Sequence, residues 1–303
     1  MTDKAAPSGS IAIIVAVYNG EDFLEEALQS AQAQTRAASE IIVVDDGSKD
    51  RSAEIARDCG ATVISQANGG QAAARNAGIR ASSSEYLVFL DHDDRLLKNN
   101  LAVNASYLDA DPGLGYVGGR SVTIRADGAR IEGAVNGPDS TVPCSYKTLM
   151  EGEAFVPPSS VMFRCTSVQE AGGFNAEMRS GNEELDLFFK IARRRTTLRH
   201  DIAIAEYRRH DSNHSSNSLG LLASVLELLE AQRPHCAGDA ALLAAIETGK
   251  RHWAAIYGPA LVGKAMGDLK QGKTRRALQG LALAARVHPQ SYVRYAKKQL
   301  RRN

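Results

Sequence analysis

The segment Tyr86-Leu-Val-Phe-Leu-Asp91-His92-Asp93-Asp94 is a short apolar stretch that ends in acidic residues. A continuous apolar run of this length, followed by polar residues, is typical of a strand buried in a sheet. Carboxylates that crowd the end of a strand repel one another, and a bound divalent cation relieves that repulsion. Asp-x-Asp spacing places Asp91 and Asp93 on the same side of an extended chain. The segment therefore predicts a metal site, and the alternative is a solvated turn whose aspartates cap a helix.

The chain before this segment alternates short apolar runs with amphipathic stretches. Continuous apolar runs predict strands buried on both faces, and apolar residues three and four positions apart predict helices. Their alternation indicates βαβ units with right-handed crossovers, and thus an α/β fold with a mostly parallel sheet flanked by helices. Asn19 is expected to cap the first helix. The expected strands span residues 11–17, 41–44, 61–65 and 85–90, and the later helices span 51–59 and 70–81.

Polar side chains follow three of these strands. The first strand ends in Tyr18-Asn19, the second in Asp45-Asp46, and the fourth in the acidic segment. Open α/β sheets bind ligands at the carboxyl ends of their strands, so these groups should converge on one edge. No Gly-x-Gly-x-x-Gly follows the first strand and no Gly-x-x-x-x-Gly-Lys-Ser/Thr occurs, which leaves a dinucleotide site or a P-loop unsupported. A phosphate at this edge would have to be held through a metal.

The composition points to a globular protein of the cytoplasm. The 303 residues are 44% hydrophobic and 23% charged, which is ordinary for such a protein. No stretch reaches the ~18 uncharged apolar residues of a membrane span, and residues 1–10 lack the apolar core of an export signal. The four cysteines have no paired spacing, which favours reduced thiols and argues against a zinc site.

Six motifs occur in a fixed order between residues 11 and 216. They are Ile14-Val-Ala-Val-Tyr-Asn-Gly-Glu-Asp-Phe-Leu, Ile41-Ile-Val-Val-Asp-Asp-Gly-Ser-Lys-Asp, Asn68-Gly-Gly-Gln-Ala-Ala-Ala-Arg-Asn-Ala-Gly, Phe89-Leu-Asp-His-Asp-Asp, Gly172-Gly-Phe-Asn with Gly181-Asn-Glu-Glu-Leu-Asp-Leu, and Tyr207-Arg-Arg-His. Together they resemble family 2 glycosyltransferases of the GT-A fold. The resemblance implies a GT-A domain over residues 1–217, with a donor half at about 11–110 and an acceptor half at about 111–217.

The remaining residues, 218–303, are expected to form a helical C-terminal extension. Leu- and Ala-rich stripes predict helices at 219–232, 239–249 and 250–257, and Asp239 is a fitting cap for the second of these. A helical hairpin is expected around Gly272.

The resemblance implies a nucleotide-diphospho-sugar donor, a divalent metal (Mn²⁺ or Mg²⁺) and inversion at the anomeric carbon. Tyr18 would lie against the base, and Asp46 would accept a hydrogen bond from a base N–H, which favours uridine or thymidine. Each residue has a structural alternative: packing for Tyr18, loop capping for Asp46, and a solvated surface position for Arg75 or His210. The implied nucleotide-binding residues are Val17, Tyr18, Asn19, Asp46, Arg75, Asn76 and Asp91, and the implied metal ligands are Asp91, Asp93 and His210.

The general base is expected at the start of a helix after Gly181. The family usually has Glu-Asp here with Asp as the base, but this chain has Glu183-Glu184, so Glu184 takes that position with one extra methylene. Because a misplacement of ~1 Å can cost ~100-fold in rate, Asp186 is retained as a second candidate. The alternative is that these acids only stabilise the positive end of the helix.

The net charge of +1 conceals an uneven distribution. Residues 264–303 contain eleven Lys and Arg and one acid, so this tail carries +10 and the rest of the chain −9. A basic tail predicts peripheral contact with an anionic membrane at its inner face. The alternatives are a solvated helical face or a homo-oligomer contact. Nucleic acid is not expected, because the charges lack interleaved aromatic residues beyond Tyr292 and Tyr295.

Taken together, these features predict an inverting, metal-dependent glycosyltransferase. It would move a sugar from a UDP- or dTDP-sugar to a hydroxyl of a glycan or lipid-linked glycan. One alternative is a metal-dependent nucleotidyltransferase, which also uses a carboxylate-bound metal on an α/β sheet. Another is a catalytically weak nucleotide-sugar-binding protein, suggested by the unusual Glu184.

Overall fold

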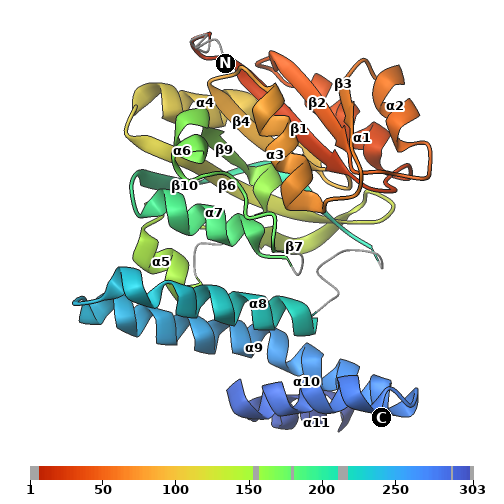
Figure 1. The fold of residues 1–303 in the computed structure, drawn as a ribbon, viewed down its shortest axis with the longest axis vertical. Helices are drawn as coiled ribbons and strands as arrows, with labels where there is room; N and C mark the ends of the chain where they lie inside the picture. Colours follow the sequence, from red (N-terminus) through yellow and green to blue (C-terminus); the bar gives the residue numbers. More distant parts are fainter. Residues whose placement is uncertain (1–6, 153–156, 179–180, 211–217, 288, 301–303) are drawn as a thin grey trace. The chain divides into compact units, whose positions relative to one another are not determined.

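The computed structural model describes residues 7–152, 157–178, 181–210, 218–287 and 289–300 (Figure 1). The chain forms two compact units. The first contains Met1–Tyr146, Ala154–Arg179 and Glu183–His210, and the second contains Lys147–Glu153, Ser180–Asn182 and Asp211–Asn303.

The first unit is built on a mixed sheet with the strand order β3-β2-β1-β4-β9-β6-β10-β5, to which β7 and β8 add at β6 and β10. Strands β1 to β4 are parallel, as predicted, whereas β9 runs antiparallel to both of its neighbours. The strands are β1 (Ile11–Val17), β2 (Glu40–Asp45), β3 (Thr62–Ser65), β4 (Tyr86–Asp91), β5 (Arg95–Leu96), β6 (Leu114–Arg125), β7 (Arg130–Asn136), β8 (Val142–Pro143), β9 (Val161–Arg164) and β10 (Thr196–Arg209). The helices are α1 (Leu24–Gln32), α2 (Ser52–Asp58), α3 (Gln71–Ala81), α4 (Asn100–Ala110), α6 (Cys165–Glu170) and α7 (Glu183–Ala192), with a 3₁₀ turn at Pro158–Ser160.

Strand β1 is buried on both faces, which explains its uninterrupted apolar sequence. Alternate side chains of a strand point to opposite faces. Ile13 and Val15 pack in the same core cluster as residues of α1 and α4, whereas Ala16 packs with Ala74 and Ala77 of α3. The alternation therefore gives each face of the sheet its own helical cover.

Gly78 sets how closely α3 approaches the sheet. A Cβ at this position would overlap the Ile14 side chain of β1, so only glycine allows the helix to lie where it does. Arg75 lies on the same helix, one turn before Gly78. The position of Arg75 against the sheet thus depends on this contact.

One expectation about the first unit differs from the structure, and one long strand was not predicted. Asn19 does not cap α1, which begins after Phe23 with no side-chain cap; its side chain instead accepts a hydrogen bond from the Lys49 N–H at 2.8 Å. The sequence motifs also gave no sign of β10 as a long strand. β10 runs parallel to β6 through two register shifts between Arg199 and Ala205, so its apolar pattern is irregular. Strands β6 and β7 pair antiparallel and form a hairpin.

The second unit is helical. Its elements are α5 (Tyr146–Glu151, of which Tyr146 belongs to the first unit), α8 (Ser218–Ala231), a 3₁₀ turn (Arg233–Cys236), α9 (Ala240–Lys270), α10 (Thr274–Val287) and α11 (Gln290–Leu300). Asp239 caps α9, as predicted, by accepting hydrogen bonds from the N–H groups of Ala241 and Leu242 at 2.9 and 3.0 Å. In the described part of the chain, no helix combines the length and apolar character needed to cross a membrane.

Helix α9 is a single helix of 31 residues where the sequence predicted two. The predicted break fell after Gly249, a residue type that commonly ends helices. Here Gly249 lies inside the helix, where a Cβ would collide with the Met150 carbonyl oxygen. Gly249 therefore allows α5 and α9 to approach each other closely, and it does not end a helix.

Candidate active site

A buried arginine joins the donor half of the sheet to helix α7. The Arg75 side chain is 1% exposed and donates hydrogen bonds to Asp91 Oδ1 at 2.7 Å and Glu184 Oε1 at 2.8 Å. A third bond runs to Glu183 Oε1 at 3.1 Å, and the guanidinium lies 5.2 Å from the centre of the Phe174 ring. The structure therefore brings together Arg75, Asp91 and Glu184, which come from three separate motifs.

The charges of this cluster do not balance, because one guanidinium meets three carboxyl groups. Burial, followed by the charge of Glu184, raises the pKa of Glu183 to about 8, although Arg75 opposes the shift. Glu183 therefore holds its proton at neutral pH. The same acids raise the pKa of Arg75 against the cost of its burial, so the guanidinium stays charged. Besides the protonated Glu183, Arg75 contacts the carboxyl groups of Asp91 and Glu184.

The second predicted base, Asp186, lies elsewhere on α7. It pairs with Lys190 one turn later, with 2.6 Å between Nζ and Oδ2. A side chain held in an i,i+4 pair stabilises a helix directly. Glu184, unlike Asp186, shares the Arg75 guanidinium with Asp91 at the end of the donor strand.

Asp93 and His210 form a pair at the end of β4, with 2.9 Å between Oδ2 and Nε2. Asp91 does not join them, since its Oδ1 accepts from Arg75 and from the Gln71 side chain at 2.9 Å. Among the residues that the structure describes, no group of three or more His, Cys, Asp or Glu side chains could hold a metal. Asp93 supplies the carboxylate through which Mg²⁺ or Mn²⁺ is commonly held together with substrate phosphates and water, and the His210 nitrogen, 2.9 Å away, is placed to be a second ligand.

Asp94, to which the sequence gave no role, is fully buried beside this pair. Its two oxygens accept from the Arg208 N–H at 3.0 Å and the Ser159 hydroxyl at 2.8 Å. Burial, with the charges of Asp93 and Asp91, raises its pKa well above the ordinary value. Asp94 thus ties the acidic segment to β10 and to the turn before β9.

Asp46 holds the loop that leads into α3. Its carboxylate accepts from the Gln66 side chain at 2.7 Å and from the N–H groups of Gly69 and Gly70 at 2.8 and 2.7 Å. A carboxylate has about four acceptor positions, so roughly one is left for a ligand. Asp46 is therefore mainly a loop anchor with limited capacity for a base N–H.

The other predicted nucleotide-binding residues are divided between surface and core. Tyr18 is 46% exposed at the end of β1, whereas the preceding Val17 is buried. Asn19 has a left-handed backbone, with φ of 51°, and its N–H donates to the Ser48 hydroxyl at 2.9 Å. Asn76 exchanges two hydrogen bonds with the backbone of Phe174, at 2.8 and 2.9 Å. Among these residues, Tyr18 has a ring that a ligand could reach. Asn76 instead holds the Gly172–Asn175 segment through its bonds to Phe174.

Sequence reasoning missed Gln71 and Arg208 as partners of the acids. Gln71 opens α3 within the motif that begins at Asn68, so its position next to the sheet edge was a usable signal. Arg208 lies in the Tyr207-Arg-Arg-His motif, where only the histidine received a role. Its contacts are with residues far away in the sequence, which local patterns do not indicate.

A mostly parallel α/β sheet that gathers polar side chains at the carboxyl ends of its strands is the architecture of a ligand-binding domain. The model of glycosyl transferase family 2 matches residues 12–168, just over half of the chain. The chain belongs to this family, which confirms the resemblance predicted from the motifs.

Curated relatives carry related names. The uncharacterized glycosyltransferase EpsJ of Bacillus subtilis is 49% identical over 89 residues, which are 28% of this chain and 26% of that protein. The uncharacterized glycosyltransferase RC0461 of Rickettsia conorii is 32% identical over 195 residues, which are 60% of this chain and 31% of that protein. The chain thus spans about a quarter to a third of the length of these two relatives.

Solved structures confirm the predicted GT-A fold. TarS residues 1–349 of S. aureus, in complex with UDP, matches with a TM-score of 0.61 and 18% identity over 80% of this chain and 72% of that one. The mannosyltransferase PcManGT of Pyrobaculum calidifontis, in complex with GDP-Man and Mn²⁺, matches with a TM-score of 0.64 and 18% identity over 98% of this chain and 82% of that one. At this identity the likeness establishes the fold alone.

Proposed function

We propose that this chain is an inverting, metal-dependent glycosyltransferase that moves a sugar from a UDP- or dTDP-sugar to a hydroxyl of a glycan or lipid-linked glycan. The observation that carries the proposal is the cluster of Arg75 with Asp91, Glu183 and Glu184. One guanidinium holds Asp91, at the end of the donor strand, and Glu184, on the helix of the acceptor half. A sugar bound next to this cluster would have its nucleotide end at β4 and the Glu184 carboxylate within reach of the acceptor.

Inversion follows from direct displacement at the anomeric carbon. The acceptor oxygen forms the new glycosidic bond while the bond to the donor diphosphate breaks, and Glu184 takes the proton of the acceptor hydroxyl. Asp93 and His210 would hold the metal, which when bound offsets the charge of the departing diphosphate. The negative Glu184 also favours a transition state with positive charge on the sugar, by analogy with glycosidases.

The donor base is proposed to lie on the exposed Tyr18 ring and to donate its N–H to Asp46. Uracil and thymine present one such N–H, which suits the single acceptor position left on Asp46. The TarS complexes contain UDP and UDP-GlcNAc, which supports this choice, whereas the PcManGT complex contains GDP-Man. A panel of UDP-, dTDP- and GDP-sugars in binding assays decides between these bases.

The basic tail is proposed to place the enzyme against the inner face of a membrane, where lipid-linked acceptors reside. The second unit exposes both basic and apolar side chains that could contact a membrane surface. They include Lys270, Lys273, Arg275 and Leu278. A homo-oligomer contact is the competing use of this surface. Co-sedimentation with phosphatidylserine vesicles, beside sedimentation velocity of the free protein, distinguishes the two uses.

Substitution of the two candidate bases tests the proposed chemistry. Glu184→Gln keeps the shape and an acceptor for Arg75 but cannot take a proton. We expect unchanged UDP-sugar binding by calorimetry, and a turnover lowered by about 10²- to 10⁴-fold in Mn²⁺-dependent transfer or slow donor hydrolysis. Asp186→Asn is the matched control on the same helix, and its turnover should stay near that of the wild type.

Three outcomes contradict parts of this scheme. Loss of turnover in Asp186→Asn but not in Glu184→Gln would make Asp186 the base. Release of pyrophosphate in place of a nucleoside diphosphate would identify a nucleotidyltransferase. Binding without any turnover, across the donor panel and with Mn²⁺ present, would leave a nucleotide-sugar-binding protein.

A further inference from the structure

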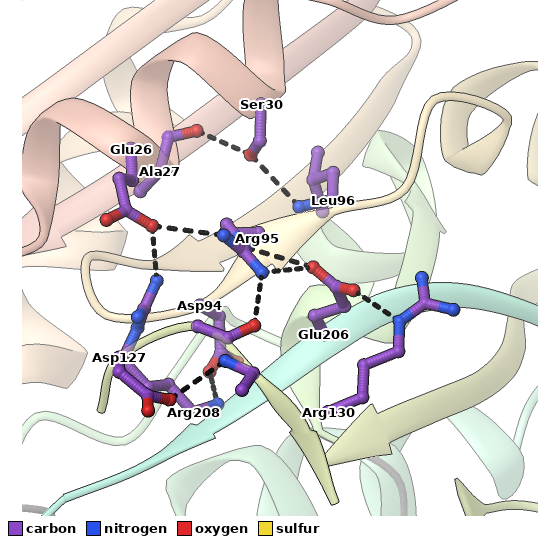
Figure 2. A network of polar contacts seen from close by, with 12 residues as sticks. Glu26, Ala27, Ser30, Asp94, Arg95, Leu96, Asp127, Arg130, Glu206 and Arg208 are labelled. Carbon is purple, nitrogen blue, oxygen red and sulfur yellow. Dashed lines mark hydrogen bonds and ion pairs between the residues drawn. The ribbon is translucent and has the colours of Figure 1, made fainter. Parts of the chain in front are cut away.

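Arg208 is a second buried arginine, and it lies behind the Asp93–His210 pair. Its side chain is 1% exposed. Nε donates to the Asp93 carbonyl oxygen at 2.8 Å, one terminal nitrogen donates to the Ala126 carbonyl at 2.8 Å, and the other meets Glu26 Oε2 at 2.7 Å. Figure 2 shows Arg208 and Arg95 converging on Glu26 from different strands. The guanidinium therefore joins the acidic segment, α1 and the β6–β7 turn.

These bonds fix the backbone that carries Asp93. The Asp93 carbonyl is held by the Arg208 side chain, and the next residue, Asp94, is held through its carboxylate by the Arg208 N–H at 3.0 Å. Two consecutive residues are thus fastened to one residue of β10. These bonds limit how far the Asp93 backbone can move relative to β10.

The same arginine supports the other member of the pair. His210 follows Arg208 by two residues, just past the end of β10. The Phe23 ring lies between them, with its centre 4.7 Å from the Arg208 guanidinium carbon and 4.8 Å from the centre of the His210 ring. Arg208 therefore contacts the backbone of one proposed ligand and, through Phe23, the ring of the other.

We infer that Arg208 is a positioning residue that holds Asp93 and His210 at the separation a divalent cation requires. The inference rests on the proposed function, since it gives the pair the task of holding the metal with the donor diphosphate. The role needs arginine specifically, because three N–H groups pointing in fixed, different directions bond three separate segments. A lysine keeps the charge but not this geometry.

Metal binding by the full-length chain with UDP tests the inference. Arg208→Lys should lower the Mn²⁺ affinity of the UDP-bound protein by about 10- to 100-fold, measured by calorimetry or by electron paramagnetic resonance of free Mn²⁺. UDP affinity in EDTA should stay at the wild-type value. Arg95→Lys is the matched control, because Arg95 shares Glu26 with Arg208 but bonds Glu206 and the Gly128 carbonyl in addition.

The outcomes separate the inference from the proposed function. An Arg208→Lys protein with wild-type Mn²⁺ affinity overturns the inference, and so does an equal loss of UDP affinity in EDTA, which marks a purely structural role. If Arg208→Lys does not fold, Phe23→Leu decides, and unchanged Mn²⁺ affinity in that variant overturns the inference. A wild-type protein whose UDP affinity does not respond to Mn²⁺ contradicts the proposed function itself and removes the basis of the inference.

Discussion

Arg75 and Arg208 are equally buried, yet their guanidinium groups meet different partners. Arg75 faces three carboxyl side chains, and all of them are mostly buried. Arg208 faces two backbone carbonyls and the carboxylate of Glu26, which is 48% exposed. Each guanidinium also lies against a phenylalanine ring, Phe174 or Phe23. The two arginines therefore share an aromatic neighbour but differ in the number of carboxyl groups that they contact.

The difference separates two uses of a buried arginine. Around Arg75, negative charge exceeds positive charge, and the protein relieves the excess by keeping a proton on Glu183. Around Arg208, the bonded atoms are largely neutral, so the residue contributes mainly fixed directions. Removing Arg75 should therefore be an electrostatic loss, and removing Arg208 mainly a loss of geometry.

The largest effect is expected from Arg75→Met, which keeps the length of the side chain and removes its charge. The change leaves Asp91, Glu183 and Glu184 buried without a cation, so the free energy of unfolding should fall by about 3–5 kcal/mol. Urea denaturation measures this. Arg51→Gln, at a residue whose side chain is 66% exposed, is the control and should change stability by less than about 0.5 kcal/mol. A fall of under ~1 kcal/mol in Arg75→Met would show that the cluster is not electrostatically dominated.

A smaller effect is expected from pH, acting through Glu183. Its pKa is about 8 in the folded chain against an ordinary 4.5, so the folded state holds the proton more tightly. This contribution to stability is complete below pH 4.5 and is lost as pH rises through about 8, at up to ~1.4 kcal/mol per pH unit. Glu183→Gln should remove that pH dependence. Denaturation midpoints of both proteins at pH 6 and pH 8 test this, and parallel midpoints would contradict the assignment.

The smallest effect is expected from Glu26→Gln, which removes the ionic partner of Arg208. Because Glu26 is half-exposed and glutamine retains an acceptor oxygen, the loss should stay within about 1 kcal/mol. Urea denaturation at low and high salt checks this. If Glu26→Gln lowered the free energy of unfolding as much as Arg75→Met, both arginines would stabilise the protein mainly through charge.

The sequence predicted the donor half of the fold well and the partners of the site residues poorly. Strands β1 to β4 and the helices between them follow from periodicity, because each is buried in a regular way. Strand β10 escaped prediction because its register shifts interrupt that regularity. Arg75 was expected beside the nucleotide, but its bonds to Glu183 and Glu184 span more than a hundred residues, and local patterns carry no signal for such contacts.

The close contact of Gly78 with Ile14 has a consequence for redesign of the donor specificity. Tyr18 stands exposed at the sheet edge, so a library of substitutions there can explore new bases with little disturbance of the interior. Any side chain at position 78 would instead push α3 outward and move Arg75 away from Asp91 and Glu184. An engineer can therefore vary the edge freely, but that glycine is best left unchanged.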